Sequence, residues 1–223
     1  MSRTFWSNCS RMSGFFVFQK GGRKMAQSLK RASIAAPCCK KRITPEVMFE
    51  YNNTHPREDA RRHDIMKSIL ESCGQRFFFE PPVHMSYSKH VHIGENFYSN
   101  FNLVLVDDGE IFIGDKVMIG PNVTLCTTGH PVYPLYREMV AHYSLPIRIG
   151  NNVWIGAHSV VLPGVTIGDN AVIGAGSIVT RDIPANTVAV GNPCRVMREI
   201  SERDKEYYFR DLKVDYPYTL REK

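Results

Sequence analysis

The stretch from Ile147 to Val179 reads IRIGNNVWIGAHSVVLPGVTIGDNAVIGAGSIV and repeats with a period of six residues. A β-branched aliphatic residue stands at every sixth position, and glycine follows most of them: Ile149, Ile155, Val161, Ile167, Ile173 and Val179. The same spacing occurs upstream at Ile113, Ile119 and Leu125, with Ile93 before them. A period of six is too short for a helical repeat and is typical of short parallel strands that stack as a β-helix.

Each repeat supplies one short strand and one corner. Val153 and Ile155 can face inward while Trp154 faces outward, because alternate residues of a strand point to opposite faces. Gly156 then begins the corner, where the missing Cβ relieves crowding. Three repeats make one triangular turn, and successive turns are expected about 4.8 Å apart. The sequence therefore predicts a mainly β protein, a hexapeptide-repeat prism of parallel strands over residues 83–196.

One long excursion interrupts the repeats, between Gly129 and Pro146. It contains His130, His142 and three prolines. A loop of this length inside a regular solenoid is costly to order and is usually functional. We therefore expect the loop 129–146 to protrude from the prism and to carry part of the functional site.

The chain begins with a basic leader over residues 1–43. Residues 1–42 hold ten of the 28 Lys and Arg residues and no Asp or Glu, which leaves 18 basic and 22 acidic residues in the remainder. Three interpretations of the leader are open. It is a disordered tail, a mitochondrial-type targeting segment, or a misassigned extension whose true start lies downstream, for example at Met25. The mildly acidic remainder predicts no nucleic-acid partner.

Helical segments are expected on both sides of the prism. Thr44-Pro45-Glu46 resembles a capped helix start with proline at the first helical position, and His55-Pro56-Arg57-Glu58 resembles a second start, so residues 44–82 form a helical N-terminal segment. Residues 197–223 are expected to form a C-terminal helix and tail. The helix itself is predicted from Ile200 to Val214, where it would cover the open end of the prism.

The cysteines and the hydropathy pattern point to a cytoplasmic protein. The six cysteines are scattered and form no C-x-x-C pair, which favours a reducing compartment. The apolar run from Phe15 to Phe18 is too short for a secretory core, and no stretch of the sequence is predicted to span a membrane.

Several motifs together resemble the galactoside and maltose O-acetyltransferases, and most of all the galactoside enzymes among them. The resemblance covers about residues 47–214 and rests on these runs: Asn100-Phe101-Asn102, Val106-Asp107-Asp108, Thr128-Gly129-His130-Pro131-Val132, Ile149-Gly150-Asn151-Asn152-Val153-Trp154-Ile155-Gly156 and Gly191-Asn192-Pro193-Cys194-Arg195-Val196. Hexapeptide repeats alone are weak evidence for one activity, whereas the histidine of the protruding loop followed by Asn-Asn-Val-Trp-Ile-Gly is specific. The resemblance implies a left-handed β-helix and a homotrimer with active sites between subunits.

The resemblance also implies an activity and its residues. Members of this family move an acetyl group from acetyl-CoA to a sugar hydroxyl, and no metal is required. His130 matches the general base of the family. Ser86, Asn100 and Asp108 match acceptor-binding positions. The positions that match acetyl-CoA-contacting residues or line the site are Trp154, Ala157, Ala175, Thr180, Arg181, Arg195 and Arg198.

The sequence departs from the family pattern at two positions. The acidic acceptor-binding residue of the N-terminal region falls near Ala32, in a leader without acidic residues. Ala157 stands where the galactoside enzyme has serine, so only a backbone amide could contact the thioester there.

The implied chemistry suits these residue types. A sugar hydroxyl is a poor nucleophile at neutral pH, and a histidine with an ordinary pKa of about 6.5 can remove its proton. The guanidinium groups of Arg195 and Arg198 match the fork geometry of phosphate. Plain structural roles compete with these assignments: His142 and His158 are expected to be a loop and a corner residue, Asp107-Asp108 could form a corner turn, and Asn100 could hold a left-handed corner.

Three other functions remain open at this stage. A serine or sugar-nucleotide acyltransferase could use the same fold. A non-catalytic trimeric scaffold would explain the missing N-terminal acid. A zinc hydratase would need three convergent imidazoles, and the early histidines His84, His90 and His92 lie far from His130 along the stack.

Overall fold

The structure is a computed structural model and describes residues 45–214. The predicted basic leader, Ala32 and the last nine residues lie outside the described part. None of the helices between residues 45 and 214 has both the length and the apolar character that a membrane span requires.

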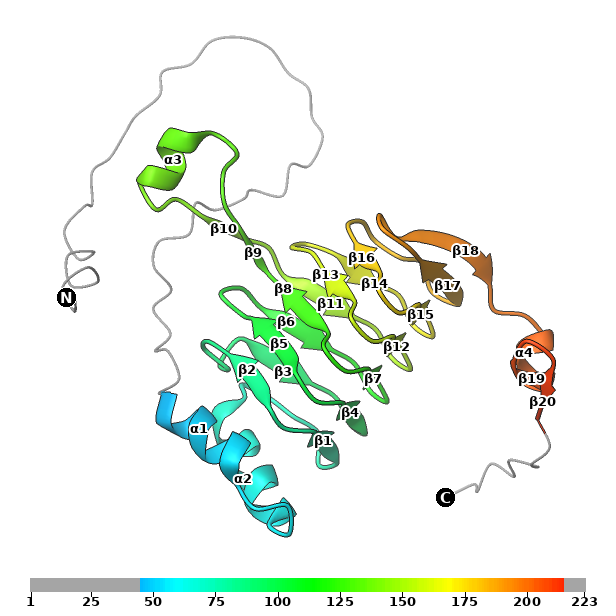
Figure 1. Cartoon of the computed structure of the whole chain (residues 1–223), viewed down its shortest axis with the longest axis horizontal. Coiled ribbons are helices and arrows are strands. Elements are labelled where there is room, and N and C mark those ends of the chain that lie inside the picture. Colours follow the sequence, from blue (N-terminus) through cyan, green and yellow to red (C-terminus); the bar gives the residue numbers. More distant parts are fainter. Residues whose placement is uncertain (1–44, 215–223) are drawn as a thin grey trace. The chain divides into compact units, whose positions relative to one another are not determined.

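The predicted parallel β-helix is confirmed, because successive strands of the chain belong to three different sheets (Figure 1). The first sheet contains, in order, β1 (Phe77–Phe79), β4 (Phe97–Ser99), β7 (Met118–Ile119), β12 (Trp154–Ile155), β15 (Val172–Ile173), β17 (Thr187–Val190) and β18 (Arg195–Glu199). The second contains β14 (Thr166–Ile167), β11 (Ile147–Ile149), β6 (Ile111–Ile113) and β3 (Val91–Ile93). The third contains β16 (Ile178–Val179), β13 (Val160–Val161), β8 (Thr124–Cys126), β5 (Leu103–Val106) and β2 (Val83–Met85).

All strand pairs within these sheets are parallel except β17 with β18, which run antiparallel. The chain therefore winds through the three sheets in turn, and each turn stacks on the one before it. The left-handed sense implied by the resemblance stays a prediction.

The core fills the prism with the inward residues of the repeats. Val153 and Ile155 are 1% and 0% exposed, whereas Trp154 between them is 51% exposed, as the alternation predicts. The corners carry residues with positive φ, among them Asn102, Asn122 and His158. Their side chains stack from turn to turn, because Asn102 Nδ2 donates to Asn122 Oδ1 at 2.9 Å. His158 is thus a corner residue, as expected, and the left-handed corner belongs to Asn102 and not to Asn100.

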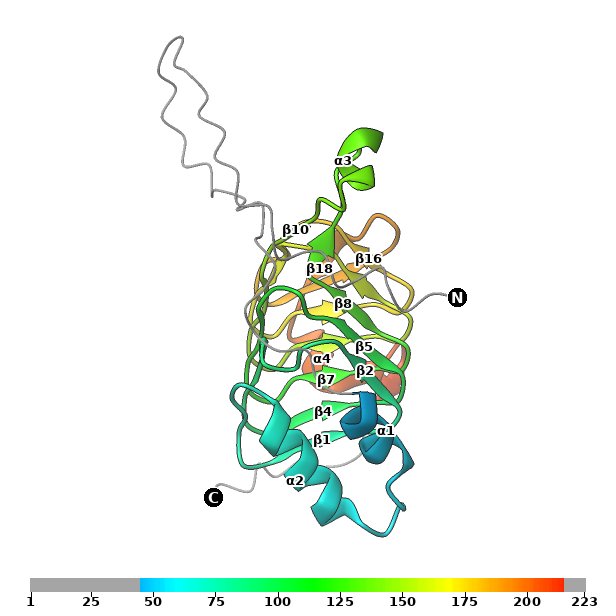
Figure 2. The same ribbon diagram turned by 90° about the vertical axis from the view of Figure 1, so that its left-hand side faces the viewer.

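Two helices, α1 (Pro45–Asn53) and α2 (Asp59–Ile69), lie at the N-terminal end of the prism (Figure 2). The side chain of Asn52 clamps α1 to β2: its Nδ2 donates to the carbonyl of Val83 at 2.9 Å and its Oδ1 accepts from the Val83 amide at 2.8 Å. The prism begins earlier than the expected residue 83, because β1 already pairs with β4. The aromatic run Phe77–Phe79 that follows the helices is therefore the first strand.

The excursion between residues 129 and 146 protrudes from the prism (Figure 2). Its stem is the antiparallel pair β9 (Thr128–Gly129) and β10 (Tyr143–Ser144), and its tip carries the short helix α3 (Pro134–Glu138). The loop is thus a hairpin with a helical tip.

The C-terminal helix predicted from Ile200 to Val214 is wrong. The structure has one helical turn, α4 (Arg203–Glu206), followed by the antiparallel hairpin of β19 (Tyr207–Phe209) and β20 (Leu212–Lys213). The side chains of this segment, residues 200–214, which we call the terminal arm, are nearly all exposed. The consecutive aromatic residues Tyr207, Tyr208 and Phe209 favour a strand, and their β-propensity outweighs the charged residues around them.

Candidate functional site

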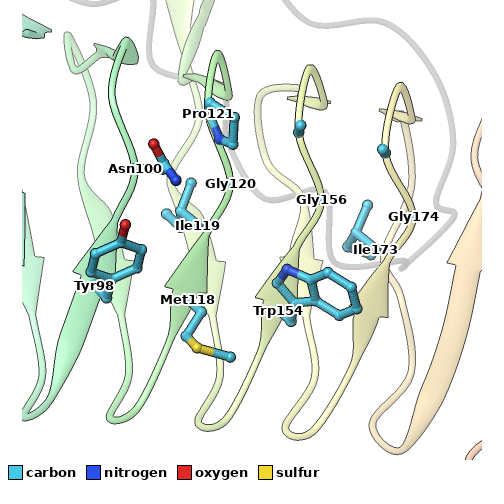
Figure 3. Close-up of a pocket in the computed structure, with 12 residues that line it drawn as sticks. Tyr98, Asn100, Met118, Ile119, Gly120, Pro121, Trp154, Gly156, Ile173 and Gly174 are labelled. Atoms are coloured by element: carbon cyan, nitrogen blue, oxygen red, sulfur yellow. The ribbon is translucent and has the colours of Figure 1, made fainter. Parts of the chain in front are cut away.

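A pocket of about 440 Å³ lies on the outer face of the first sheet and at the corner beside it (Figure 3). Tyr98, Met118 and Trp154 form a row across neighbouring strands, because Tyr98 pairs with Met118 and Met118 pairs with Trp154. Figure 3 shows Asn100 beyond this row, near the turns. The pocket therefore joins an apolar wall to a polar corner.

The corner of the pocket is made of backbone, because glycines from successive turns stack there. A Cβ at Gly120 would lie 2.7 Å from the amide nitrogen of Ala157, and one at Gly156 would lie 2.6 Å from that of Ala175. The missing Cβ atoms therefore allow successive turns to stack closely. This stacking restricts the two positions to glycine more strictly than the approach of a ligand would. Ala157 and Ala175 both line the pocket.

The backbone N–H groups of Ala157 and Ala175 have no hydrogen-bond acceptor among the described residues. The N–H groups of the residues on either side of them all donate hydrogen bonds. Gly156 donates to Ile173, and Gly176 donates to the carbonyl of Ala157. Two backbone N–H groups at one corner can bind carbonyl oxygens of a ligand. This arrangement fits the expectation that only backbone contacts a thioester at Ala157.

Of the three predicted acceptor residues, Asn100 lines this pocket and the other two do not. Ser86 and Asp108 are held together at a corner of the third sheet through the buried carboxylate of Asp107. That carboxylate accepts hydrogen bonds from the amides of Ser86 (2.7 Å) and Ser88 (2.5 Å), and also from Tyr87. The corner-turn role therefore belongs to Asp107, and the half-buried Asp108 carboxylate has no ion-pair or hydrogen-bond partner within residues 45–214.

His130 lies on the protruding loop and is exposed. Its Nδ1 is 3.0 Å from the carbonyl oxygen of Ala141, across the stem of the loop. A carbonyl oxygen can only accept, so the neutral ring carries its proton on Nδ1 and leaves Nε2 as a free base. Within one chain, His130 does not line the pocket of the first sheet.

His142 faces His130 across the same loop, with the ring centroids 6.3 Å apart. The Nδ1 of His142 lies 3.4 Å from the carbonyl oxygen of Val140, a long contact. His158, in contrast, is held at its corner by its backbone N–H, which donates to the carbonyl of Pro121 at 2.9 Å. Only His130 and His142 of these three therefore belong to the loop site.

The predicted donor-side residues fall into two groups. Trp154, Ala157 and Ala175 line the pocket, whereas Thr180, Arg181, Arg195 and Arg198 are exposed toward the C-terminal end of the prism. Arg195 donates to the carbonyl of Cys194 at 2.8 Å. Arg198 forms two bonds of 2.7 Å with the carboxylate of Asp204, which lower the pKa of Asp204 below its ordinary value. The fork of Arg198 is therefore occupied by a carboxylate.

Two of the early histidines, His90 and His92, have structural partners. His90 Nδ1 lies 2.5 Å from the carbonyl oxygen of Asp107. His92 bridges Ser72 and Glu110, each at 2.9 Å. Across the residues that the structure describes, no group of three or more His, Cys, Asp or Glu side chains could hold a metal ion.

Several pocket residues do not belong to the predicted site residues, and Tyr98 and Met118 are two of them. The feature that could have indicated these two residues is their outward position next to Trp154. This position can be recognised only when the register between turns is known. The register cannot be read from a strict period of six, since equivalent positions lie 20 residues apart in the early turns and 18 apart later.

Comparison with known proteins decides the family. Residues 146–181 match the family described as bacterial transferase hexapeptide (six repeats). The galactoside O-acetyltransferase of Escherichia coli (strain K12) is 58% identical over 169 residues, which are 76% of this chain and 83% of that protein. This chain belongs to the galactoside O-acetyltransferase family.

Solved structures of the family have the same fold. A galactoside acetyltransferase in complex with coenzyme A superposes with a TM-score of 0.75 at 57% identity, covering 77% of this chain and 86% of that chain. A maltose O-acetyltransferase from Clostridium difficile 630 superposes with a TM-score of 0.69 at 45% identity, covering 70% and 84%. Membership in the galactoside O-acetyltransferase family makes the chain an acyltransferase by class.

Proposed function

We propose that this chain is an acetyl-CoA-dependent O-acetyltransferase that acetylates a sugar hydroxyl, with His130 as the general base. The observation that carries the proposal is the tether of His130 Nδ1 to the carbonyl of Ala141 on the protruding loop, because it leaves Nε2 of the neutral ring available to accept a proton. The relatives' names, galactoside and maltose O-acetyltransferase, and the bound coenzyme A support the substrate classes.

In the proposed reaction, His130 Nε2 removes the proton of the sugar hydroxyl while the oxygen bonds to the thioester carbonyl carbon. The tetrahedral intermediate then loses its carbon–sulfur bond, and the thiolate of CoA leaves with the electron pair. The imidazolium of His130 returns the proton to the sulfur, so the products are an acetyl ester and free CoA. A positioned base contributes about 10²–10⁴-fold to such a step.

The pocket of the first sheet supports a role as the donor site. Its apolar row, Tyr98, Met118 and Trp154, can cover an extended pantetheine arm. The free amides of Ala157 and Ala175 lie where carbonyl oxygens of the donor would need hydrogen-bond donors, including the oxygen that becomes negative in the intermediate.

The acceptor is assigned to Ser86 and Asp108, at a corner of the third sheet, and to Asn100, which lines the pocket of the first sheet. The Asp108 carboxylate has no partner within the described part of the chain, so it can accept hydrogen bonds from two sugar hydroxyls. Asp107 fixes the backbone around it, because its buried carboxylate binds the amides of residues 86–88. Such a preorganised carboxylate is typical of polar recognition.

A homotrimer with shared sites is the assembly that we propose. Within one chain His130 does not line the pocket of the first sheet, so a neighbouring copy has to supply the histidine that acts at this pocket. The loop exposes apolar side chains, with Val132 93% and Met139 71% exposed, and Trp154 on the sheet is also exposed. Exposed apolar surface of this kind marks contact with another protein chain.

The three cysteines of the described part support a reducing, cytoplasmic location in this proposal. Cys73, Cys126 and Cys194 are all free thiols. Burial raises the pKa of Cys194, which keeps it in the thiol form at neutral pH.

A thiol-release assay tests the proposed function. Acetyl-CoA is offered with galactosides, glucosides, maltose, serine and a sugar nucleotide, and free CoA is measured. We expect activity with a simple sugar and a loss of about 10²–10⁴-fold in kcat for His130→Ala. His55→Ala, which changes an exposed histidine between the two N-terminal helices, is the control and should retain activity.

Each other result has a defined meaning. Full activity of His130→Ala would overturn the assignment of the base. Transfer to serine or to the sugar nucleotide alone would reassign the acceptor. Release of no thiol with any acceptor, from intact wild-type protein, would favour the scaffold.

A further inference from the structure

Two histidines face each other where the protruding loop leaves its stem. The outermost pair of the stem is Gly129 with Tyr143. Continuing this register by one residue places His130 opposite His142, and the centroids of the two rings lie 6.3 Å apart. Residues directly opposite each other in an antiparallel pair have their side chains on one face. His142 therefore shares its face of the loop with the proposed base.

The same face of the stem carries two hydroxyl groups. Alternate residues of a strand lie on one face, so Thr128 belongs to the face of His130 and Ser144 to the face of His142. Thr128 Oγ1 and Ser144 Oγ are hydrogen-bonded at 2.9 Å. Two hydroxyls and two imidazoles thus form one polar strip. Hydroxyl and imidazole groups can both donate and accept hydrogen bonds, as the hydroxyls of a sugar do.

The Nε2 atoms of both rings are unused within one chain. Both rings turn Nδ1 toward backbone carbonyls of the same turn, His130 toward Ala141 at 3.0 Å and His142 toward Val140 at 3.4 Å. The second contact is too long for a well-formed hydrogen bond. Neither Nε2 has a hydrogen-bond partner among residues 45–214. Because His142 is half-buried, a ligand hydroxyl that pairs with its ring would remove the cost of an unpaired polar atom.

A strained turn presents these two carbonyls to the rings. Val140 has a φ of +57°, in the left-handed region that a β-branched residue rarely adopts. The Val140 amide donates to the carbonyl of Arg137 and the Ala141 amide to that of Tyr136, each at 2.9 Å. Backbone strain persists only where the surroundings fix the conformation, and it is frequent at ligand sites. The turn therefore sets where the two rings lie beyond the stem.

We propose that His142 is a second acceptor-binding imidazole, whose Nε2 hydrogen-bonds to a hydroxyl next to the one that His130 deprotonates. The inference rests on the proposed function, because it concerns the same sugar. Each ring nitrogen reaches an oxygen at about 2.8 Å, so the two rings can bind neighbouring hydroxyls of one sugar at once. Since both histidines belong to one loop, the chain that supplies the base to a shared site also supplies His142. His142 thereby favours sugars that carry this second hydroxyl.

The test removes one sugar hydroxyl or one imidazole at a time. The probes are methyl galactoside and methyl glucoside, intact and as monodeoxy analogues that keep the acetylated hydroxyl. The variants are His142→Ala and His142→Phe, of which the second keeps a flat ring without its nitrogens. His55→Ala, whose histidine lies outside the loop, is the control. Thiol release gives kcat and KM for each sugar, and the KM for acetyl-CoA and the sedimentation mass are measured alongside.

We expect both His142 variants to raise the KM for the intact sugar about 3- to 10-fold, the effect of one lost hydrogen bond, and to keep kcat within about twofold of wild type. One monodeoxy analogue should show the same increase in KM with wild-type protein. That analogue should show no further increase with either variant, because the missing hydroxyl and the missing imidazole are partners. The KM for acetyl-CoA and the mass should not change, and His55→Ala should match wild type.

An unchanged KM in both variants, or additive losses for every analogue, would overturn the inference and leave the proposed function intact. A lower kcat in His142→Ala that His142→Phe restores would also overturn it, because His142 would then only hold the ring of His130 in place. If wild-type protein acetylates neither sugar, the proposed function fails and the inference fails with it.

Discussion

At the residue scale, two adjacent carboxylates differ in what surrounds them. Asp107 is fully buried and its oxygens accept the amides of residues 86–88. Asp108 is half-buried and faces no partner in the described part of the chain. The sequence marks both as a possible corner, and it cannot say which carboxylate points inward, because that depends on how the strand enters the turn.

This difference predicts opposite effects of the same substitution. Asp107→Ala leaves three backbone amides without an acceptor, and we expect a loss of about 3 kcal/mol or more in the free energy of unfolding. Asp108→Ala should change that free energy by less than about 0.5 kcal/mol and should abolish sugar acetylation. Urea unfolding and the thiol-release assay measure the two effects. Equal destabilisation by both would contradict the assignment.

At the element scale, helix α1 is fastened to the prism by side chains that bind backbone. Asn52 satisfies both the N–H and the C=O of Val83, and the Tyr51 hydroxyl donates to the carbonyl of Phe79 at 2.6 Å. Burial raises the pKa of Tyr51, so this hydroxyl stays protonated throughout the physiological range.

Two neighbouring asparagines test this fastening. Asn52→Ala should cost about 1–3 kcal/mol, because it leaves a strand N–H and a carbonyl unpaired. Asn53 bonds only within its own helix, to the carbonyl of Phe49 at 2.8 Å, so Asn53→Ala should be nearly neutral. Thermal unfolding of both variants measures the difference. Equal melting temperatures would show that α1 is held by other contacts.

The terminal arm has a defined response to acid. Arg198 lowers the pKa of Asp204 in the folded arm, so the pair stabilises the arm above the unfolded pKa of about 3.9 and loses this effect only as the pH falls through the lower, folded value. Protection of the Ser201 amide against hydrogen exchange should therefore persist at pH 4 in wild type and be weak at any pH in Asp204→Asn. Loss of protection between pH 6 and 5 in wild type would contradict this.

Sequence patterns predicted some elements and not others, for physical reasons. The hexads are predicted well, because every strand repeats the same alternation around an interior that only aliphatic residues fill. The C-terminal segment has no such repeat, and its charged residues resemble a helix surface although the aromatic run pairs as a hairpin. The helical region before the prism ends earlier than expected, since Phe77–Phe79 pairs with a strand 20 residues away.

At the scale of the whole molecule, the site is built from parts that sequence alone cannot place together. His130, the Asp108 corner and the Trp154 row belong to the loop, the third sheet and the first sheet. Asn100 and Trp154 meet in one pocket only because turns of unequal length bring them into register. The resemblance to the family named the residues, and the arrangement of sheets explains which of them share a surface.

The assembly provides a test at this scale. Wild-type protein should sediment at three times the mass of one chain. Val132→Glu combined with Met139→Glu places charges on the exposed apolar tip of the loop and should give monomers without acetyltransferase activity. Phe49→Glu changes an equally exposed apolar residue on α1 and should remain trimeric. A wild-type monomer with full activity would exclude shared sites.

The imidazole of His130 is fixed at the base of the protruding loop, separately from the residues of the loop's tip. His130 is anchored to Ala141 just beyond the paired strands β9 and β10, and the Arg137 side chain ties the tip to the carbonyls of Pro131 and Val132. Residues between these anchors that do not contact a neighbouring copy can be exchanged without displacing the base. Such positions form a segment in which new preferences among carbohydrates could be selected while the chemical step stays the same.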